Sequence, residues 1–428
     1  MCCYEEDSRL EAFRQFRKEI RGSQDYLIVG IDIAKEKHHA FFGTATGKTL
    51  LRRLIFDNTI EGFEKLLDQT EAIQSSYKLK KVVFGMEPTA NYHKPLGEHL
   101  IRCGRMVVLV GGVAVKRNRE LLDGRWDKHD DKDAANVADL ISQGKCLFYE
   151  CPVMEIRDLR HLLSLKRKLR KQEHGYRVRI RNQLIARYFP ELDQYSGYPE
   201  TEAIVRWCLD PSRIAGFEND QFETMVSSGR KTLVKKKRLD DIQKLAIASI
   251  GCEMGEGAGF DAKIMVEGLR HIRKAIQDTE NKIEETCKQF PEYDYLLTIP
   301  GFGPDVSAKV LGALGNPHRF FNQQQVLKMA GLDLGADRSG KTSQNAVPVI
   351  SKQGKADLRY ALYQAAFVAA SRNKEFMFYF AKQLQGREKE KGIKTKRFVK
   401  LSAKFLVIAW TLMKKQEVFD IKYLKQIE

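Results

Sequence analysis

The hydrophobic pattern of the chain changes once, at Cys151-Pro152, and this change most constrains what it can fold into. Before this point, short apolar runs rich in β-branched residues alternate with helix-like segments. After it, apolar residues recur almost entirely at helical spacing. A chain of 428 residues is also too long for one ordinary domain. We therefore predict a mixed α/β domain followed by a largely helical part.

In the N-terminal part, three strand-like runs come in a row before any long helix. Strands are expected at residues 26–34, 38–43, 48–56, 81–87 and 106–110. Helices are expected at 8–21, after a capping Thr59, at 92–103, and from about Asp133. Three consecutive strands followed by strand–helix alternation predict a mixed sheet with helices on its faces.

Two long helices are expected in the second part. Residues 156–188 keep helical spacing until Pro190, and residues 262–289 form the second helix. There, one heptad position is shared by Leu269, Ile276, Ile283 and Phe290, and the other by Ile272, Thr279 and Thr286. The repeat favours an antiparallel coiled-coil arm, or one that pairs with another subunit. Ordinary bundle helices remain an alternative, and residues 190–262 have no clear pattern beyond the basic run at 235–238.

The basic surplus of the chain is concentrated in the helical part. The whole sequence has 73 Lys and Arg against 56 Asp and Glu, a net charge of +17. Residues 1–150 hold 24 basic and 23 acidic residues, whereas residues 151–428 hold 49 and 33. Two blocks, 157–187 and 352–404, carry most of the excess. One such block is usually a solvated helix face, but two in the same part favour a nucleic acid partner.

Several protein classes are not expected from the composition. No run approaches 18 uncharged apolar residues, and the N-terminus lacks the pattern of a signal peptide. Eight scattered cysteines without a Cys-x-x-Cys pair predict neither a disulfide framework nor a zinc site. We therefore expect no membrane association and a cytoplasmic location.

Four carboxylates are the candidate metal ligands. Asp32 interrupts an apolar strand, where a charge is costly unless it is paired or bound to a metal. Glu87 ends the next buried strand. Asp130 and Asp133 are three residues apart at a helix start, which places both on one face. Oxygen ligands of this kind suit Mg²⁺ or Mn²⁺, and such a metal pair supports phosphoryl transfer.

Each of these carboxylates also has a simpler explanation, and the alternatives stay open at this level. Asp32 is then a strand-end acid in a turn and Glu87 a surface acid. Asp130 and Asp133 are then part of a solvated helix start with a capping Asp. Three other acids lie nearby and compete for the same role: Asp127, Asp131 and Asp139.

Two further segments carry candidate functional residues. Residues 296–308 read as a helix–hairpin–helix, in which Gly301 and Gly303 would let backbone N–H groups approach a phosphate; the alternative is a tight helix–helix turn. Downstream, Ser339 precedes Gly340 in a basic segment and would expose its hydroxyl to a phosphate. Most Ser-Gly pairs are merely turns, and Ser343 and Ser351 are equally plausible from the residues alone.

The order of these motifs closely resembles the transposases of the insertion sequence 110 family, which includes the Piv-type DNA invertases. The matching segments are Ile-Asp32-Ile-Ala-Lys, Met-Glu87-Pro-Thr, Asp130-x-x-Asp133-Ala, Ile-Pro-Gly-x-Gly, Ser339-Gly and Ile-Ser-Lys-x-Gly. The resemblance covers roughly residues 26–150 and 293–415. The sequence departs from the family pattern at Ala90, where glycine is frequent, and at His129.

The resemblance implies an activity and a set of partners. It implies a RuvC-like (RNase H-like) domain in which Asp32, Glu87, Asp130 and Asp133 bind Mg²⁺ or Mn²⁺. It also implies a coiled-coil linker and a C-terminal domain in which Ser339 attacks DNA to form a covalent phosphoserine intermediate. Family members act as dimers and tetramers on the DNA of the element ends and the target. They are guided by a structured bridge RNA from the element.

These expectations define the predicted organisation of the chain. The segments are an N-terminal extension (1–25), the RuvC-like domain (26–150), a helical linker (151–292) with an insertion at about 190–262, and the transposase domain (293–428). Beyond the catalytic residues, we expect nucleic acid contacts at Gly301, Gly303, Arg338, Lys341, Lys352 and Arg359. A bacterial or archaeal, nucleoid-associated protein is expected. The rivals are a RuvC-type nuclease that uses water and a non-catalytic nucleic-acid scaffold.

Overall fold

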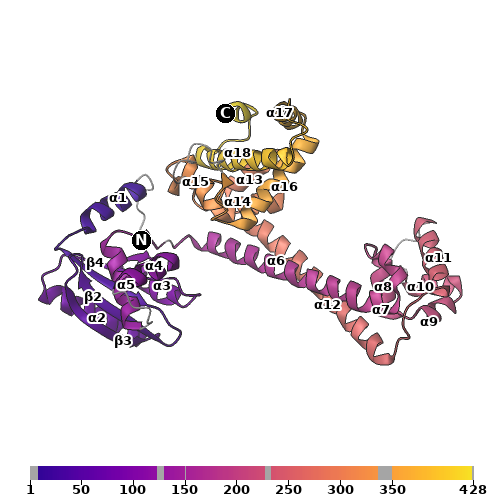
Figure 1. Cartoon of the computed structure of the whole chain (residues 1–428), viewed down its shortest axis with the longest axis horizontal. Helices are drawn as coiled ribbons and strands as arrows, with labels where there is room; N and C mark the ends of the chain where they lie inside the picture. The colour runs from indigo at the N-terminus through magenta and orange to yellow at the C-terminus, as the bar shows by residue number, and fades with distance from the viewer. Residues whose placement is uncertain (1–7, 123–129, 150, 227–232, 336–348, 427–428) are drawn as a thin grey trace. The chain divides into compact units, whose positions relative to one another are not determined.

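A computed structural model describes residues 8–122, 130–149, 151–226, 233–335 and 349–426 (Figure 1). The chain forms two compact units, and each is described by itself. The first comprises residues 1–153 and 316–325, and the second comprises residues 154–315 and 326–428. Among the described helices, none combines the length and apolar composition needed to cross a bilayer.

The first unit contains the predicted mixed sheet. Its elements are α1 (Ser8–Ile20), β1 (Tyr26–Asp32), β2 (Lys37–Thr44), β3 (Thr49–Asp57), α2 (Ile60–Ser76), β4 (Lys81–Met86), α3 (His93–Arg102), β5 (Met106–Leu109), α4 (Gly112–Leu122), α5 (Asp130–Ser142) and β6 (Leu147–Phe148). The strand order is β3-β2-β1-β4-β5-β6. β4 pairs in parallel with β1 and with β5, and the other pairs are antiparallel. The five predicted strands are confirmed, and Thr59 accepts the N–H of Gly62 as the cap of α2. Helix α4 and strand β6 were not predicted.

Alternation along the buried strands gives the sheet two apolar faces. In β1, Leu27, Val29 and Ile31 pack with α2 and α3. Tyr26 and Ile28 point the other way and pack with α1, α4 and α5. Because side chains alternate along a strand, Gly30 and Asp32 belong to this second face. The face covered by α4 and α5 is therefore the one on which Asp32 lies.

Helix α5 crosses the sheet in direct contact with two paired glycines. Gly30 of β1 is the register partner of Gly85 of β4. A Cβ on Gly30 would lie 2.2 Å from the carbonyl oxygen of Ala134, and one on Gly85 would lie 2.0 Å from Cδ1 of Ile141. A side chain at Gly30 would collide with the backbone of α5, whereas one at Gly85 would displace the side chain of Ile141. The glycine pair therefore sets how close this helix comes to the strand ends.

The second unit is helical apart from one two-stranded ribbon. Its elements and the adjoining segment are α6 (Met154–Arg179), η1 (Ile180–Ile185), α7 (Ala186–Tyr188), η2 (Pro190–Tyr195), α8 (Pro199–Trp207), α9 (Pro211–Ala215), α10 (Asn219–Val226), α11 (Leu233–Ile247), α12 (Glu256–Cys287), α13 (Pro291–Leu297), α14 (Pro304–Leu314), η3 (Pro317–Arg319), α15 (Gln323–Ala330), β7 (Leu334–Gly335), β8 (Val349–Ile350), α16 (Ala356–Arg372), α17 (Lys374–Leu384), α18 (Ile393–Lys415) and α19 (Lys422–Gln426). The segment that had no clear pattern, 190–262, forms several short helices. They share an apolar core with η1 and the start of α12.

The two long helices α6 and α12 run antiparallel (Figure 1). Arg170 lies 3.0 Å from Glu280, and Arg273 lies 3.2 Å from Glu173. The Tyr176 ring packs against Gly268. Residues that come later in α6 contact residues that come earlier in α12, which is the pattern of an antiparallel pair. Leu269, Ile276 and Ile283 of the predicted heptad position are buried, whereas α6 contributes only Ile156 and Leu159 as buried residues.

One buried histidine fixes the turn that follows Asp32. His38 is fully buried beside the rings of Phe56 and Phe63. Its Nδ1 accepts the N–H of Ala34 at 3.2 Å. Burial lowers the pKa of His38 below its usual value, because the charged imidazolium is poorly solvated there. Protonation of the ring is therefore less favourable in the fold than in the unfolded chain.

We predict that the free energy of unfolding falls as the pH drops below about 6.5. The unfolded chain takes up a proton at His38 that the folded chain binds only at lower pH. His38 therefore makes its full contribution to the free energy of unfolding above about pH 6.5. Below that pH the contribution is lost, by at most about 1.4 kcal/mol per pH unit. Denaturant unfolding between pH 5 and 8 measures this slope. His38→Gln keeps an acceptor but cannot titrate, so an unchanged slope in that variant would contradict the assignment.

Candidate active site

Two of the predicted carboxylates lie side by side at one edge of the sheet. The parallel register pairs Ile31 with Met86, and Asp32 and Glu87 are the next residue on each chain segment. Each comes two residues after one of the paired glycines, so both lie on the side of the sheet covered by α5. Strand pairing thus brings together two acids that are 55 positions apart in the sequence.

Glu87 lies against the first residue of α4. A Cβ on Gly112 would sit 2.6 Å from Oε1 of Glu87, so this carboxylate fills the space where a side chain would be. Gly112 begins α4, and a helix N-terminus carries partial positive charge that favours a carboxylate. Neither α4 nor this contact was predicted, because the segment shows little apolar periodicity.

Asp133 is buried on α5, directly before the residue that touches Gly30. Its Oδ1 lies 2.6 Å from Nη2 of Arg119 on α4, and its side chain is only 6% exposed. Helices α4 and α5 are joined by Asn118, whose Nδ2 donates to Asn136 and Asp139 at 2.7 Å each. Asp139, one of the competing acids, is therefore part of the helix–helix contact.

Asp130 is the first residue of α5, as the sequence predicted for a helix start. Its side chain lies outside the described part of the structure. Among the side chains that are described, no three Asp, Glu, His or Cys groups come together in the way a metal ion requires. The donor types still fit a divalent cation, since Oδ1 of buried Asp133 has no hydrogen-bond partner and Glu87 packs against a glycine.

Ser339, Arg338, Lys341 and Ser343 fall in residues 336–348, outside the described residues. The chain on either side of this segment is built into a rigid stem, which we define as residues 329–335 and 349–355. β7 pairs with β8, and the backbone N–H of Ser351 donates to Asp333 at 2.9 Å. The two segments touch at glycines, since a Cβ on Gly354 would lie 2.4 Å from the nitrogen of Gly331.

Two residues that were predicted to have other roles form hydrogen bonds that hold this stem together. The hydroxyl of Ser351 donates to Oδ1 of Asp333 at 2.5 Å. Arg359 donates from Nη1 to the carbonyl oxygen of Ala330 at 2.8 Å. The side chain of Lys352 is exposed, and its backbone adopts φ +56°. The predicted phosphate contacts at Lys352 and Arg359 remain predictions, and Arg359 already has a structural partner.

The predicted hairpin is formed by α13 and α14. Gly301 has φ +87°, and a Cβ there would lie 2.4 Å from the carbonyl oxygen of Ala365 on α16. Its identity therefore has a structural reason, whereas a Cβ at Gly303 would meet nothing within 4 Å. Burial by itself would raise the pKa of Asp305, at the start of α14. Its hydrogen bonds to Lys166 and Lys309 have the opposite effect and outweigh burial, so the pKa of Asp305 lies below its usual value. This carboxylate already offsets part of the positive helix end.

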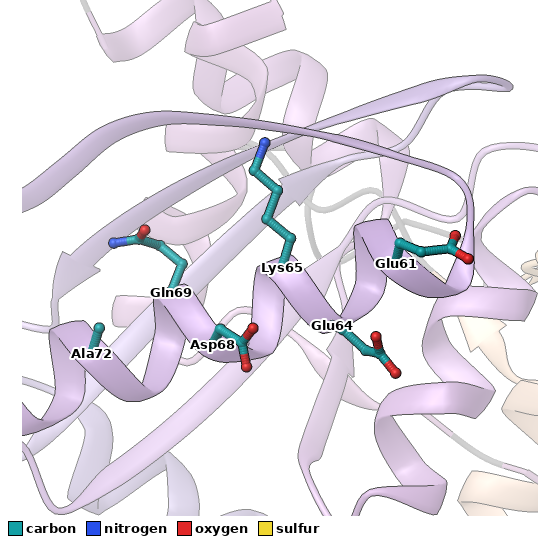
Figure 2. A pocket seen from close by; sticks show the side chains of 6 residues that line it. All are labelled: Glu61, Glu64, Lys65, Asp68, Gln69 and Ala72. Atoms are coloured by element: carbon teal, nitrogen blue, oxygen red, sulfur yellow. The ribbon is translucent and has the colours of Figure 1, made fainter.

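A surface depression on α2 contains none of the predicted site residues. Figure 2 shows its lining, in which Glu61, Glu64 and Asp68 are acidic and the other residues are Lys65, Gln69 and Ala72. The Nζ of Lys65 donates to the carbonyl oxygen of Ile55 at 3.0 Å. Helix α2 covers the face of the sheet opposite α4 and α5, so this depression is separate from the carboxylates.

Comparison with known proteins assigns the family. A DEDD transposase domain of the IS110 type matches residues 29–190, and the transposase domain of the IS116/IS110/IS902 family matches residues 293–381. Together the two matches include every predicted catalytic residue. The chain belongs to the insertion sequence 110 family of transposases. Residues 191–292, which contain the short helices α8 to α11, are matched by neither domain.

Individual relatives agree with this family. The mini-circle transposase assigned to IS117 of Streptomyces coelicolor is 21% identical over 71% of this chain and 76% of its own length. An uncharacterized 44.8 kDa protein of insertion element IS116 from Streptomyces clavuligerus is 22% identical over 92% of this chain and 96% of its own length. The pilin gene-inverting protein of Moraxella lacunata is 26% identical over 36% of this chain and 48% of its own length. Membership implies a DNA transposase or recombinase activity.

The backbone conformation at Ala90 favours glycine, the residue that the resemblance to the family predicts there. Ala90 has φ +46°, in the left-handed region that a Cβ makes unfavourable by about 1 kcal/mol. It lies three residues after Glu87, in the turn between β4 and α3. The departure seen in the sequence therefore adds local strain next to a predicted ligand.

We predict that Ala90→Gly raises the free energy of unfolding by up to about 1 kcal/mol, because glycine adopts this conformation without strain. The matched control is Ala72→Gly on the exposed side of α2, which is expected to lower it by about 1 kcal/mol. Thermal unfolding of the two full-length variants compares the signs. A decrease for both substitutions would show that the turn is not strained at Ala90.

Proposed function

We propose that this transposase is metal-dependent and that its RuvC-like domain binds the metal through Asp32, Glu87, Asp130 and Asp133. The observation that carries the proposal is the pairing of β1 with β4, which places Asp32 beside Glu87 under the helix that bears the other two acids. Mg²⁺ or Mn²⁺ held there would stabilise the charge that develops on a phosphodiester.

In the same proposal, Ser339 is the nucleophile. Its Oγ forms an ester bond to the DNA phosphorus and the P–O bond to the leaving strand breaks. The serine hydroxyl loses its proton, and the oxygen of the leaving strand takes one up, so that this strand ends in a free hydroxyl. The stem holds both ends of the segment that carries Ser339 and Ser343, and the resemblance to the family selects Ser339. Ser351 is the weaker candidate, since its hydroxyl is engaged by Asp333. Arg338 and Lys341 would contact the phosphate from positions next to the nucleophile.

Partners follow from the family and from the charge distribution. The basic block of residues 157–187 lies mainly on α6, and the block of residues 352–404 spans α16 to α18. We propose that these helices hold DNA and a structured bridge RNA through their phosphates. We also propose that the long helices form a coiled-coil arm, that subunits assemble as dimers and tetramers, and that the serine of one completes the metal site of another. A nucleoid-associated location follows from the DNA substrate.

We predict that the wild-type protein forms a covalent adduct with DNA when Mg²⁺ and the native RNA are present, and that Ser339→Ala forms none. Labelled DNA that stays with the protein on a denaturing gel measures the adduct. Ser343→Ala is the matched control and should retain it. Asp32→Asn should lower adduct formation by about 100-fold or more, because one ligand of the catalytic ion is lost.

The alternative activities give different results in the same assay. An adduct that persists in Ser339→Ala places the nucleophile elsewhere. Cleavage by the wild type without any adduct indicates a RuvC-type nuclease that uses water. Binding without cleavage, in the presence of Mg²⁺ and RNA, indicates a scaffold.

A further inference from the structure

Arg119 is a cation placed directly at one of the proposed metal ligands, and no motif of the sequence drew attention to it. It lies on α4, its side chain is 25% exposed, and Nη2 is 2.6 Å from Oδ1 of Asp133. Its position is imposed by packing, because the preceding residue, Asn118, is bonded to Asn136 and Asp139 of α5. The guanidinium is therefore held at Asp133 by the contact between the two helices.

The ion pair is close but its hydrogen bonds are incomplete. Oδ1 of Asp133 and Nε of Arg119 are both buried without a hydrogen-bond partner, so the short approach lacks the geometry of a directed bond. A buried ion pair is stabilising only when its remaining polar atoms are also satisfied. Each member of this pair thus retains capacity for another partner, and for a carboxylate oxygen that partner is a cation.

We propose that Arg119 is the counter-ion of Asp133 in the metal-free protein, and that a divalent ion must displace its guanidinium to reach that carboxylate. This inference rests on the proposed metal site. Without metal, Asp133 is a buried carboxylate, and the positive charge of Arg119 beside it offsets part of the cost of burying that charge. With metal, two cations compete for one buried oxygen. Arg119 is a positioning residue, since it acts through Asp133.

The test is a titration of the full-length protein with MnCl₂, without nucleic acid, by isothermal calorimetry. Arg119→Gln removes the charge and is expected to bind Mn²⁺ about tenfold more tightly, which corresponds to about 1.4 kcal/mol. Arg119→Lys keeps the positive charge, so its Mn²⁺ affinity should stay closer to that of the wild type than the affinity of Arg119→Gln does. Arg117→Gln, on the exposed side of the same helix, is the matched control and should not change the affinity.

Thermal melting provides the second measurement. In EDTA, Arg119→Gln is expected to melt below the wild type, and in saturating Mn²⁺ the difference should close. A merely structural role for Arg119 predicts the same loss in both conditions and no gain in Mn²⁺ affinity. If Arg119→Gln is unfolded in EDTA, folding on addition of Mn²⁺, but not of NaCl at equal ionic strength, supports the proposal, and failure to fold in both overturns it.

Failure of this inference is distinguishable from failure of the metal site itself. Mn²⁺ binding in the wild type that Asp32→Asn removes, together with an unchanged or weaker affinity in Arg119→Gln, overturns only the role of Arg119. If the wild type binds no Mn²⁺, or Asp32→Asn binds it as well as the wild type, the proposed metal site is wrong and the inference falls with it.

Discussion

The close approach of α5 to the sheet is the constraint on which the candidate active site depends. Gly30 and Gly85 are partners in the parallel ladder, and both lack the Cβ that would collide with α5. The helix therefore reaches the strands just before they end at Asp32 and Glu87. The same helix carries the buried Asp133, directly before the residue that contacts Gly30.

Charge is the second constraint, since several acids near one edge of a sheet need compensation. The structure supplies it from α4, whose N-terminus meets Glu87 and whose Arg119 meets Asp133. In the second unit, the short ribbon of β7 and β8 joins the residues that flank 336–348. There, close glycine contacts and the Arg359 bond to a carbonyl hold the backbone.

Prediction from sequence succeeded where the pattern is local. The strands, the Thr59 cap, the hairpin at Gly301 and both long helices were expected, because alternation, capping and helical spacing are read within a few residues. It missed α4, which begins at a glycine and contributes few buried apolar residues. It also missed the short helices of residues 190–262, since several of them begin at prolines and only their shared core reveals them as one cluster.

The sequence by itself determined which residue types are available for chemistry and that strand ends and a helix start carry them. Only the tertiary structure decided that Asp32 and Glu87 are neighbours, that Asp139 serves the helix contact, and that Arg119 meets Asp133. The same is true of Gly301, whose absent side chain makes room for α16. The physical reason is that register and helix packing join residues far apart in the chain, and no local periodicity records the partner across that distance.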